Sequence, residues 1–65
     1  MWVVIHMAKG KQRCDAIEAA LTKDGVLVKI KPAYRNVSES DNYFQICVLQ
    51  SETEQARQVL VENGF

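Results

Sequence analysis

Six residues in the first half of the chain could together hold an anion: Lys9, Gly10, Lys11, Arg13, Lys31 and Arg35. The first four lie at the start of a segment with helical periodicity, where free backbone N–H groups favour anions over cations. A bound phosphate or carboxylate would neutralise the neighbouring cations. No GxGxxG or Walker sequence accompanies Gly10. The alternative is a set of solvated surface charges paired with Glu39 and Asp41.

The other reactive side chains give no catalytic or metal-binding pattern. His6 is the only histidine, and one histidine with two distant cysteines lacks the spacing of a metal site. Cys14 and Cys47 form no CxxC pair, so both are expected as free thiols. Arg13 and the nearby helix start could lower the pKa of the Cys14 thiol, but the apolar stripe around it favours an unreactive core thiol. Cys47 is then the more accessible thiol. We therefore predict that the protein is not an enzyme and uses no cofactor and no metal.

Length and composition describe one small domain spanning residues 1–65. The hydrophobic fraction is 48% and the charged fraction 25%, which is typical of globular proteins. No stretch approaches the ~18 to 20 apolar residues of a membrane span. The apolar run between Met1 and Met7 is also too short for a secretory signal. We expect a cytoplasmic protein that does not associate with membranes.

The formal net charge of zero hides two halves of opposite sign. Residues 1–35 contain seven of the eight basic residues and three acidic residues, a sum of +4. Residues 36–65 contain one basic and five acidic residues, a sum of −4. This balance does not favour nucleic-acid binding, so we expect no nucleic-acid partner. It is compatible with a local anion site and with association between oppositely charged surfaces.

Hydrophobic periodicity predicts three strands and two helices. Alternating side chains indicate strands at residues 2–8, 26–31 and 43–49. Apolar residues at i, i+3 and i+7 indicate a helix over residues 11–23, which Gly25 ends. A second helix begins at the capping-box spacing between Ser51 and Glu54 and closes at Gly64. Residues 32–42 form a polar loop that is long for so short a chain.

The order β-α-β-β-α favours an α+β fold, namely a ferredoxin-like sheet that lacks its fourth strand. A helical crossover makes the first two strands parallel, and a hairpin places the third strand antiparallel between them. Both helices then cover one face of the sheet. The predicted core consists of Val3, Ile5, Met7, Ile17, Leu21, Val28, Ile30, Phe44, Ile46, Val48, Val59 and Leu60.

The opposite face of the sheet has no part of the chain left to cover it. Its predicted residues are Trp2, Val4, His6, Leu27, Lys29, Tyr43, Gln45, Cys47 and Leu49. A half-apolar face indicates an interaction surface, and the first strand is an edge without charge or proline to prevent pairing. We expect a homodimer or another protein partner there. The alternative is a monomer in which Trp2 and Tyr43 shield their neighbours.

Several short motifs resemble those of one protein family. They are Met1-Trp2 followed by Val4, Ala8 before the turn, the Ala-rich helix ending in Gly25, the run from Leu27 to Pro32, and Ser51-Glu52-x-Glu54-x-Ala56. The family consists of very short bacterial proteins, best known from Firmicutes, related to a domain labelled as a prokaryotic signal-transducing protein. The resemblance spans nearly all 65 residues. It implies the same β-α-β-β-α fold and a signal-transduction role without an established activity. Some short chains of this kind are labelled glutamate decarboxylase, but this chain has no lysine motif for the pyridoxal-phosphate cofactor.

We therefore interpret the chain as a small binding or regulatory module that acts through self-association or through a protein partner. Two alternatives from other classes stay open. The first is a sensor of a small anionic metabolite at the turn before the first helix. The second is an accessory subunit of a larger enzyme.

Overall fold

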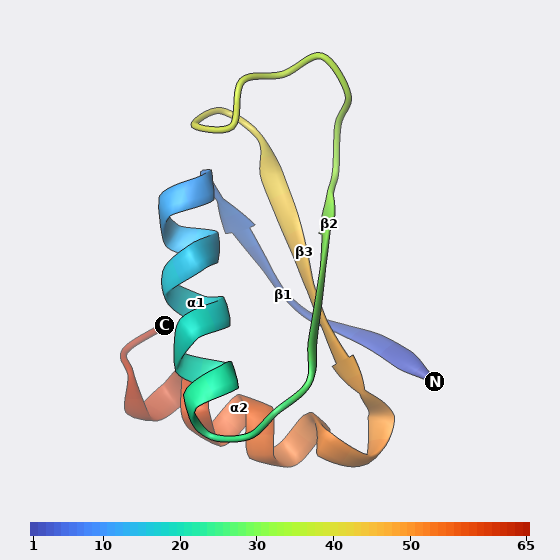
Figure 1. Cartoon of the computed structure of the whole chain (residues 1–65), viewed down its shortest axis with the longest axis vertical. Coiled ribbons are helices and arrows are strands. Elements are labelled where there is room, and N and C mark those ends of the chain that lie inside the picture. Colours follow the sequence, from blue (N-terminus) through green and yellow to red (C-terminus); the bar gives the residue numbers. More distant parts are fainter.

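A three-stranded sheet and two helices make up the protein (Figure 1). The computed structural model describes residues 1–65. Its elements in chain order are β1 (Trp2–Lys9), α1 (Lys11–Lys23), β2 (Val28–Pro32), β3 (Tyr43–Leu49), the 3-10 helix η1 (Gln50–Glu52) and α2 (Thr53–Glu62). The strand order is β1-β3-β2, and β3 runs antiparallel to both neighbours. The predicted α+β fold, a ferredoxin-like sheet without its fourth strand, is confirmed.

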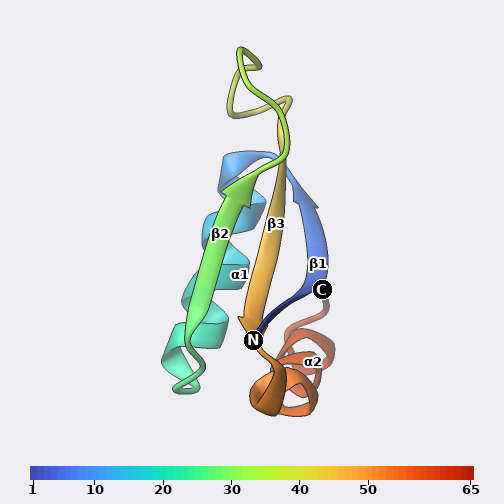
Figure 2. The same cartoon turned by 90° about the vertical axis from the view of Figure 1, so that its right-hand side faces the viewer.

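The central strand, β3, determines how the layers are arranged. Because β1 and β2 each run antiparallel to β3, they are parallel to one another, and α1 forms the crossover between them. Phe44, Ile46 and Val48 of β3 alternate toward the helices and are buried. Figure 2 shows α1 behind the three strands and α2 crossing beneath the end of the sheet where β1 begins.

One hydrophobic core joins the sheet to both helices. Its buried members are Ala8, Cys14, Ile17, Leu21, Val26, Phe44, Ile46, Val48, Ala56, Val59 and Leu60. Four further residues that the sequence placed in the core, Val3, Ile5, Val28 and Ile30, are only partly buried. All four lie on the edge strands, where two short helices leave part of the sheet uncovered.

A β-bulge in β1 corrects the predicted placement of two residues. Val4 pairs with Cys47, but His6, and not Ile5, pairs with the next residue of β3, Ile46. The extra residue reverses the alternation beyond it, because directly paired side chains lie on the same face. His6 therefore lies on the helix face and not on the opposite face. Met7, predicted in the core, lies on the opposite face with 46% of its surface exposed.

Glycine ends α1 as the sequence predicts. Gly25 has a φ of +83°, which is a left-handed conformation that glycine adopts without a steric penalty. The Gly25 N–H donates to the Thr22 carbonyl at 3.0 Å, and the Val26 N–H donates to the Leu21 carbonyl at 3.0 Å. Leu21 and Val26 are both buried, so this turn brings the chain from the helix back into the core.

The predicted capping box at the second helix is wrong. Residues Gln50–Glu52 form η1, and α2 begins only at Thr53. No side chain caps the first turn of α2. Instead, the Thr53 hydroxyl donates to the Gln50 carbonyl at 2.8 Å, and the Gln50 N–H donates to the Met1 carbonyl at 2.9 Å. The tight turn after β3 is therefore joined to the beginning of β1.

The long loop between β2 and β3 folds back over the start of α1. The Gly10 N–H donates to the Asn42 carbonyl at 2.8 Å, and the Lys11 N–H donates to the Glu39 carbonyl at 3.0 Å. The buried Asn42 side chain donates to the Tyr34 carbonyl at 2.9 Å and accepts from the Tyr43 N–H at 2.8 Å. These bonds position residues 33–42 beside the first turn of α1.

Candidate functional site

The sheet face opposite the helices collects most of the exposed apolar side chains. We call this surface the open face, and the strand register assigns to it Trp2, Val4, Met7, Lys9, Lys29, Lys31, Tyr43, Gln45, Cys47 and Leu49. Leu27 adjoins it just before β2, and the Tyr34 ring packs edge-on against the Tyr43 ring with centroids 6.5 Å apart. Nine large hydrophobic side chains of the protein are exposed, and six of them lie on or beside the open face: Trp2, Val4, Met7, Leu27, Tyr34 and Tyr43.

All of the charged groups on the open face are lysines. Lys9 pairs across the strands with Tyr43, Lys29 with Cys47, and Lys31 with Gln45, so each lysine has a neutral neighbour. The single salt bridge of the protein joins Lys11 to Asp15, outside this face. The three open-face ammonium groups therefore have no carboxylate within 4.0 Å. The open face is apolar and positive, without a compensating acid.

The predicted accessible thiol, Cys47, is covered. Lys29 and Val4 flank it on the two neighbouring strands. The Lys29 ammonium lies 5.7 Å from the centroid of the Trp2 ring, so the two side chains meet above β3. Only 4% of the Cys47 surface is exposed. The sequence places Cys47 on the right face but does not show that its neighbours close over it.

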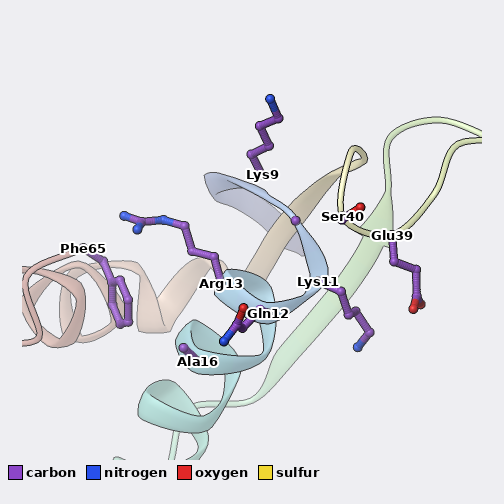
Figure 3. A pocket seen from close by; sticks show the side chains of 9 residues that line it. Lys9, Lys11, Gln12, Arg13, Ala16, Glu39, Ser40 and Phe65 are labelled. Atoms are coloured by element: carbon purple, nitrogen blue, oxygen red, sulfur yellow. The ribbon is translucent and has the colours of Figure 1, made fainter.

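A cleft lies at the start of α1 beneath the long loop (Figure 3). Its volume is about 660 Å³, and its lining residues are Lys9, Gly10, Lys11, Gln12, Arg13, Ala16, Glu39, Ser40 and Phe65. Four of the six residues of the predicted anion site thus line one cavity. The other two, Lys31 and Arg35, do not line it. Lys31 lies on the open face instead.

The cationic side chains around the cleft point in different directions (Figure 3). The Lys11 ammonium donates to the Asp15 carboxylate at 2.6 Å, and this bond raises the pKa of Lys11 above its ordinary value. The Arg13 guanidinium lies over the Phe65 ring, 5.4 Å from its centroid. Lys9 extends away from both. The cleft therefore brings the predicted residues together without directing their charges at one point.

Backbone donors at this helix start are partly used. The Lys11 N–H already donates to Glu39, and the first bond within the helix is from the Cys14 N–H to the Gly10 carbonyl at 3.1 Å. The N–H groups of Gln12 and Arg13 precede that bond and have no partner within the helix. No acidic side chain lies in the first turn.

Cys14 is a buried core thiol, as its apolar stripe predicts. Its side chain is fully buried between α1 and the sheet. Burial raises the pKa of the Cys14 thiol above its ordinary value of 9.0, and the charge of Lys11 opposes this only in part. The lowered pKa considered from the sequence is wrong, because burial outweighs the neighbouring cation. No group of three or more His, Cys, Asp or Glu side chains has a metal-binding arrangement.

No family model, curated protein or solved structure matches the chain. The family resemblance drawn from the short motifs therefore stays a prediction. Neither α1 nor α2 is long and apolar enough to span a lipid bilayer.

Sequence reasoning missed several residues of the two surfaces. On the open face these are Met7 and Lys9, which the bulge moves, and Tyr34, which lies in the loop. In the cleft they are chiefly Gln12, Ser40 and Phe65. Gln12 could have been found from the sequence, since it shares the first helical turn with Lys11. The positions of Ser40 and Phe65 depend on how distant segments fold together.

Proposed function

We propose that the protein is a small protein-binding module that holds an acidic partner on its open face. One observation carries the proposal: four of the nine exposed large hydrophobic side chains lie on the open face and two more beside it, together with three lysines and no acid on that face. Contiguous apolar surface of this kind is typical of interaction sites. The unpaired lysines favour a partner with complementary negative charge.

A second copy of the chain fits the open face less well. A face-to-face dimer with two-fold symmetry brings the same surface of both copies together. Such an interface would contain the Lys9, Lys29 and Lys31 side chains of both copies and no acid from the open face.

Self-association along the outer edge of β1 stays a separate prediction. This edge pairs with no strand, and residues 2–8 carry neither proline nor Lys, Arg, Asp or Glu. The bulge at Ile5 interrupts it and so weakens the pairing that a second β1 could make. Sedimentation velocity at micromolar concentration tests this prediction: a 7.4 kDa species alone contradicts it.

The proposed function can be tested by affinity capture with matched surface variants. The wild-type protein, a Met7→Ser/Leu27→Ser variant and a Val61→Ser control are immobilised and exposed to extract of the source cells. Val61 is 73% exposed on α2, far from the open face in sequence, so its substitution removes apolar surface elsewhere. We expect the wild type and the Val61→Ser control to retain an acidic protein. The double variant should not retain it. Equal retention by all three, or no retained protein, overturns the proposal.

The anion site expected at the start of α1 supports no functional proposal. Lys11 is already paired with Asp15, and Arg13 is stacked on Phe65. It stays a sequence-based prediction, as do the signal-transduction role and the accessory-subunit alternative.

A further inference from the structure

We infer that the partner docks a single amphipathic α-helix along the strands of the open face, with its acidic edge over β2. This inference rests on the proposed function and specifies the part of the partner that is bound. Three observations support it: the width of the sheet, the separation of apolar from charged side chains across the strands, and the spacing of the lysines on β2.

The width of the sheet suits one helix. Three strands spaced by ~4.8 Å are about 14 Å across. A helix with its side chains is about 10 to 12 Å in diameter, so the width of the face suits one helix lying along the strands. On the other side of the same sheet, α1 already forms such a layer. Helices on both faces of a sheet are one of the layer architectures that bury two apolar faces.

Apolar and charged side chains are separated over most of the open face. The β1 side carries Trp2, Val4 and Met7, with Lys9 only at its C-terminal end, whereas the β2 side carries Lys29 and Lys31. The neutral side chains of β3 lie between them. A helix lying along the strands therefore presents apolar residues to β1 and β3 and carboxylates to β2. A helix that is acidic on all sides would desolvate its charges against β1 without a partner.

The spacing of the β2 lysines matches one turn of a helix. Lys29 and Lys31 are two residues apart on the same side of a strand, which is ~6.6 Å along its axis. Residues i and i+4 of a helix are ~6 Å apart along its axis and lie on the same face. Glu or Asp at these two positions would therefore reach both ammonium groups. Lys9 lies at the C-terminal end of β1, on the loop side of the sheet, and adds positive charge there.

Stacked nucleic-acid bases fit the same surface less well. Base stacking needs free aromatic faces. The Trp2 ring already holds the Lys29 ammonium, and the Tyr34 and Tyr43 rings pack edge-on against one another. Single-stranded nucleic acid is therefore the competing occupant that the experiment must exclude.

The experiment is a selection from a displayed library of random 18-residue peptides on the immobilised full chain. Such a peptide is ~27 Å long as a helix, which matches a strand of the open face. We expect enriched sequences with an apolar stripe of helical period and Asp or Glu at i and i+4. Proline-rich, strand-like or basic sequences, or no enrichment at all, overturn the inference.

Charge reversal then tests the predicted orientation with the best peptide. A Lys29→Glu/Lys31→Glu variant is compared with a Lys23→Glu/Arg57→Glu control, which changes the net charge equally on exposed positions of α1 and α2. We expect at least a tenfold loss of affinity in the first variant, a minor loss in the control, and recovery when the peptide carboxylates become lysines. Equal losses in both variants, or tighter binding of an oligothymidine strand than of the peptide, overturn the inference.

Failure of this inference and failure of the proposed function are distinguishable. If Met7→Ser/Leu27→Ser loses a cellular partner while the lysine reversal changes nothing, the open face binds protein but not an acidic helix. If neither variant changes the binding of any protein, both the proposed function and the helix inference fail. Amide shifts of Trp2, Val4 and Cys47 on titration with the peptide would show that the peptide occupies the open face.

Discussion

The two faces of the sheet share their strands but differ in what covers them. On the helix face, Ile46 and Val48 of β3 are completely buried by α1 and α2. On the open face, Tyr43 and Gln45 of the same strand are at least partly exposed, and the charged neighbours are all lysines. Alternating residues of one strand thus serve two purposes. The helix face stabilises the fold, whereas the open face leaves apolar area available for binding.

The largest difference between the faces should appear in stability. Replacing Ile46 by Ala removes buried methyl groups and leaves a cavity, so we expect the free energy of unfolding to fall by about 2 to 5 kcal/mol. Gln45→Ala, one residue away on the open face, should change it by less than about 0.5 kcal/mol. Urea denaturation of both variants measures the difference. Comparable losses in the two variants would contradict the assignment of the faces.

A second, smaller effect follows from the bulge and concerns the neighbouring residues Ala8 and Met7. Ala8 is completely buried on the helix face, so Ala8→Leu overfills the core and should cost about 1 to 3 kcal/mol. Met7→Ser removes a half-exposed side chain and should cost about 1 kcal/mol or less. An unbroken alternation in β1 predicts the reverse order. Thermal or urea unfolding of the two variants therefore decides whether Ile5 is the extra residue.

The two cysteines should differ in how they become accessible. Cys47 is covered by side chains that meet above β3, and Cys14 by the core. Trp2→Ala should therefore raise the iodoacetamide alkylation rate of Cys47 severalfold and leave that of Cys14 unchanged after correction for global stability. Mass spectrometry of the labelled peptides separates the two rates. If both rates rise together, unfolding and not the loss of Trp2 exposes Cys47.

The smallest expected effect is a pH dependence of stability caused by Cys14. Burial raises the pKa of its thiol in the folded protein, so the unfolded chain loses this proton first as the pH rises. The contribution of the protonated Cys14 thiol to the free energy of unfolding is fully present below the unfolded pKa near 9.0. It is lost as the pH rises through the folded pKa. We expect the free energy of unfolding to decline more steeply above that pH in the wild type than in Cys14→Ala. Parallel curves for the two proteins would show that the thiol does not contribute.

The sequence predicts α1 and β3 to the residue because their patterns have clear limits. Residues 11–23 lie between Gly10 and Gly25, and residues 43–49 alternate without interruption. The bulge in β1 could not be predicted in this way. Both faces of residues 2–8 are largely apolar, so no alternation fixes which residues point to the core. One extra residue then moved His6 and Met7 to the faces opposite to those expected.

The anion site was predicted only in part for a related reason. Lys9, Gly10, Lys11 and Arg13 are neighbours in the chain, so any helix start brings them to one cleft. Lys31 and Arg35 could reach it only if β2 and the loop placed them there. Strand alternation puts Lys31 on the open face, and Asn42 anchors the loop by bonds that composition does not reveal. The pairing of Lys11 with Asp15 follows their i, i+4 spacing and was recoverable from the sequence.

The meeting of Lys29 with Trp2 also gives the protein an optical reporter. Trp2 is the only tryptophan in the chain, so its fluorescence arises from a single place on the open face. The centroid of its ring lies 5.7 Å from the Lys29 ammonium group. Carboxylates of a bound helix would attract this ammonium group and move it away from the ring. The emission of the unlabelled protein should then change in wavelength or intensity as the open face fills. Occupancy could be followed in solution with no dye attached to either molecule.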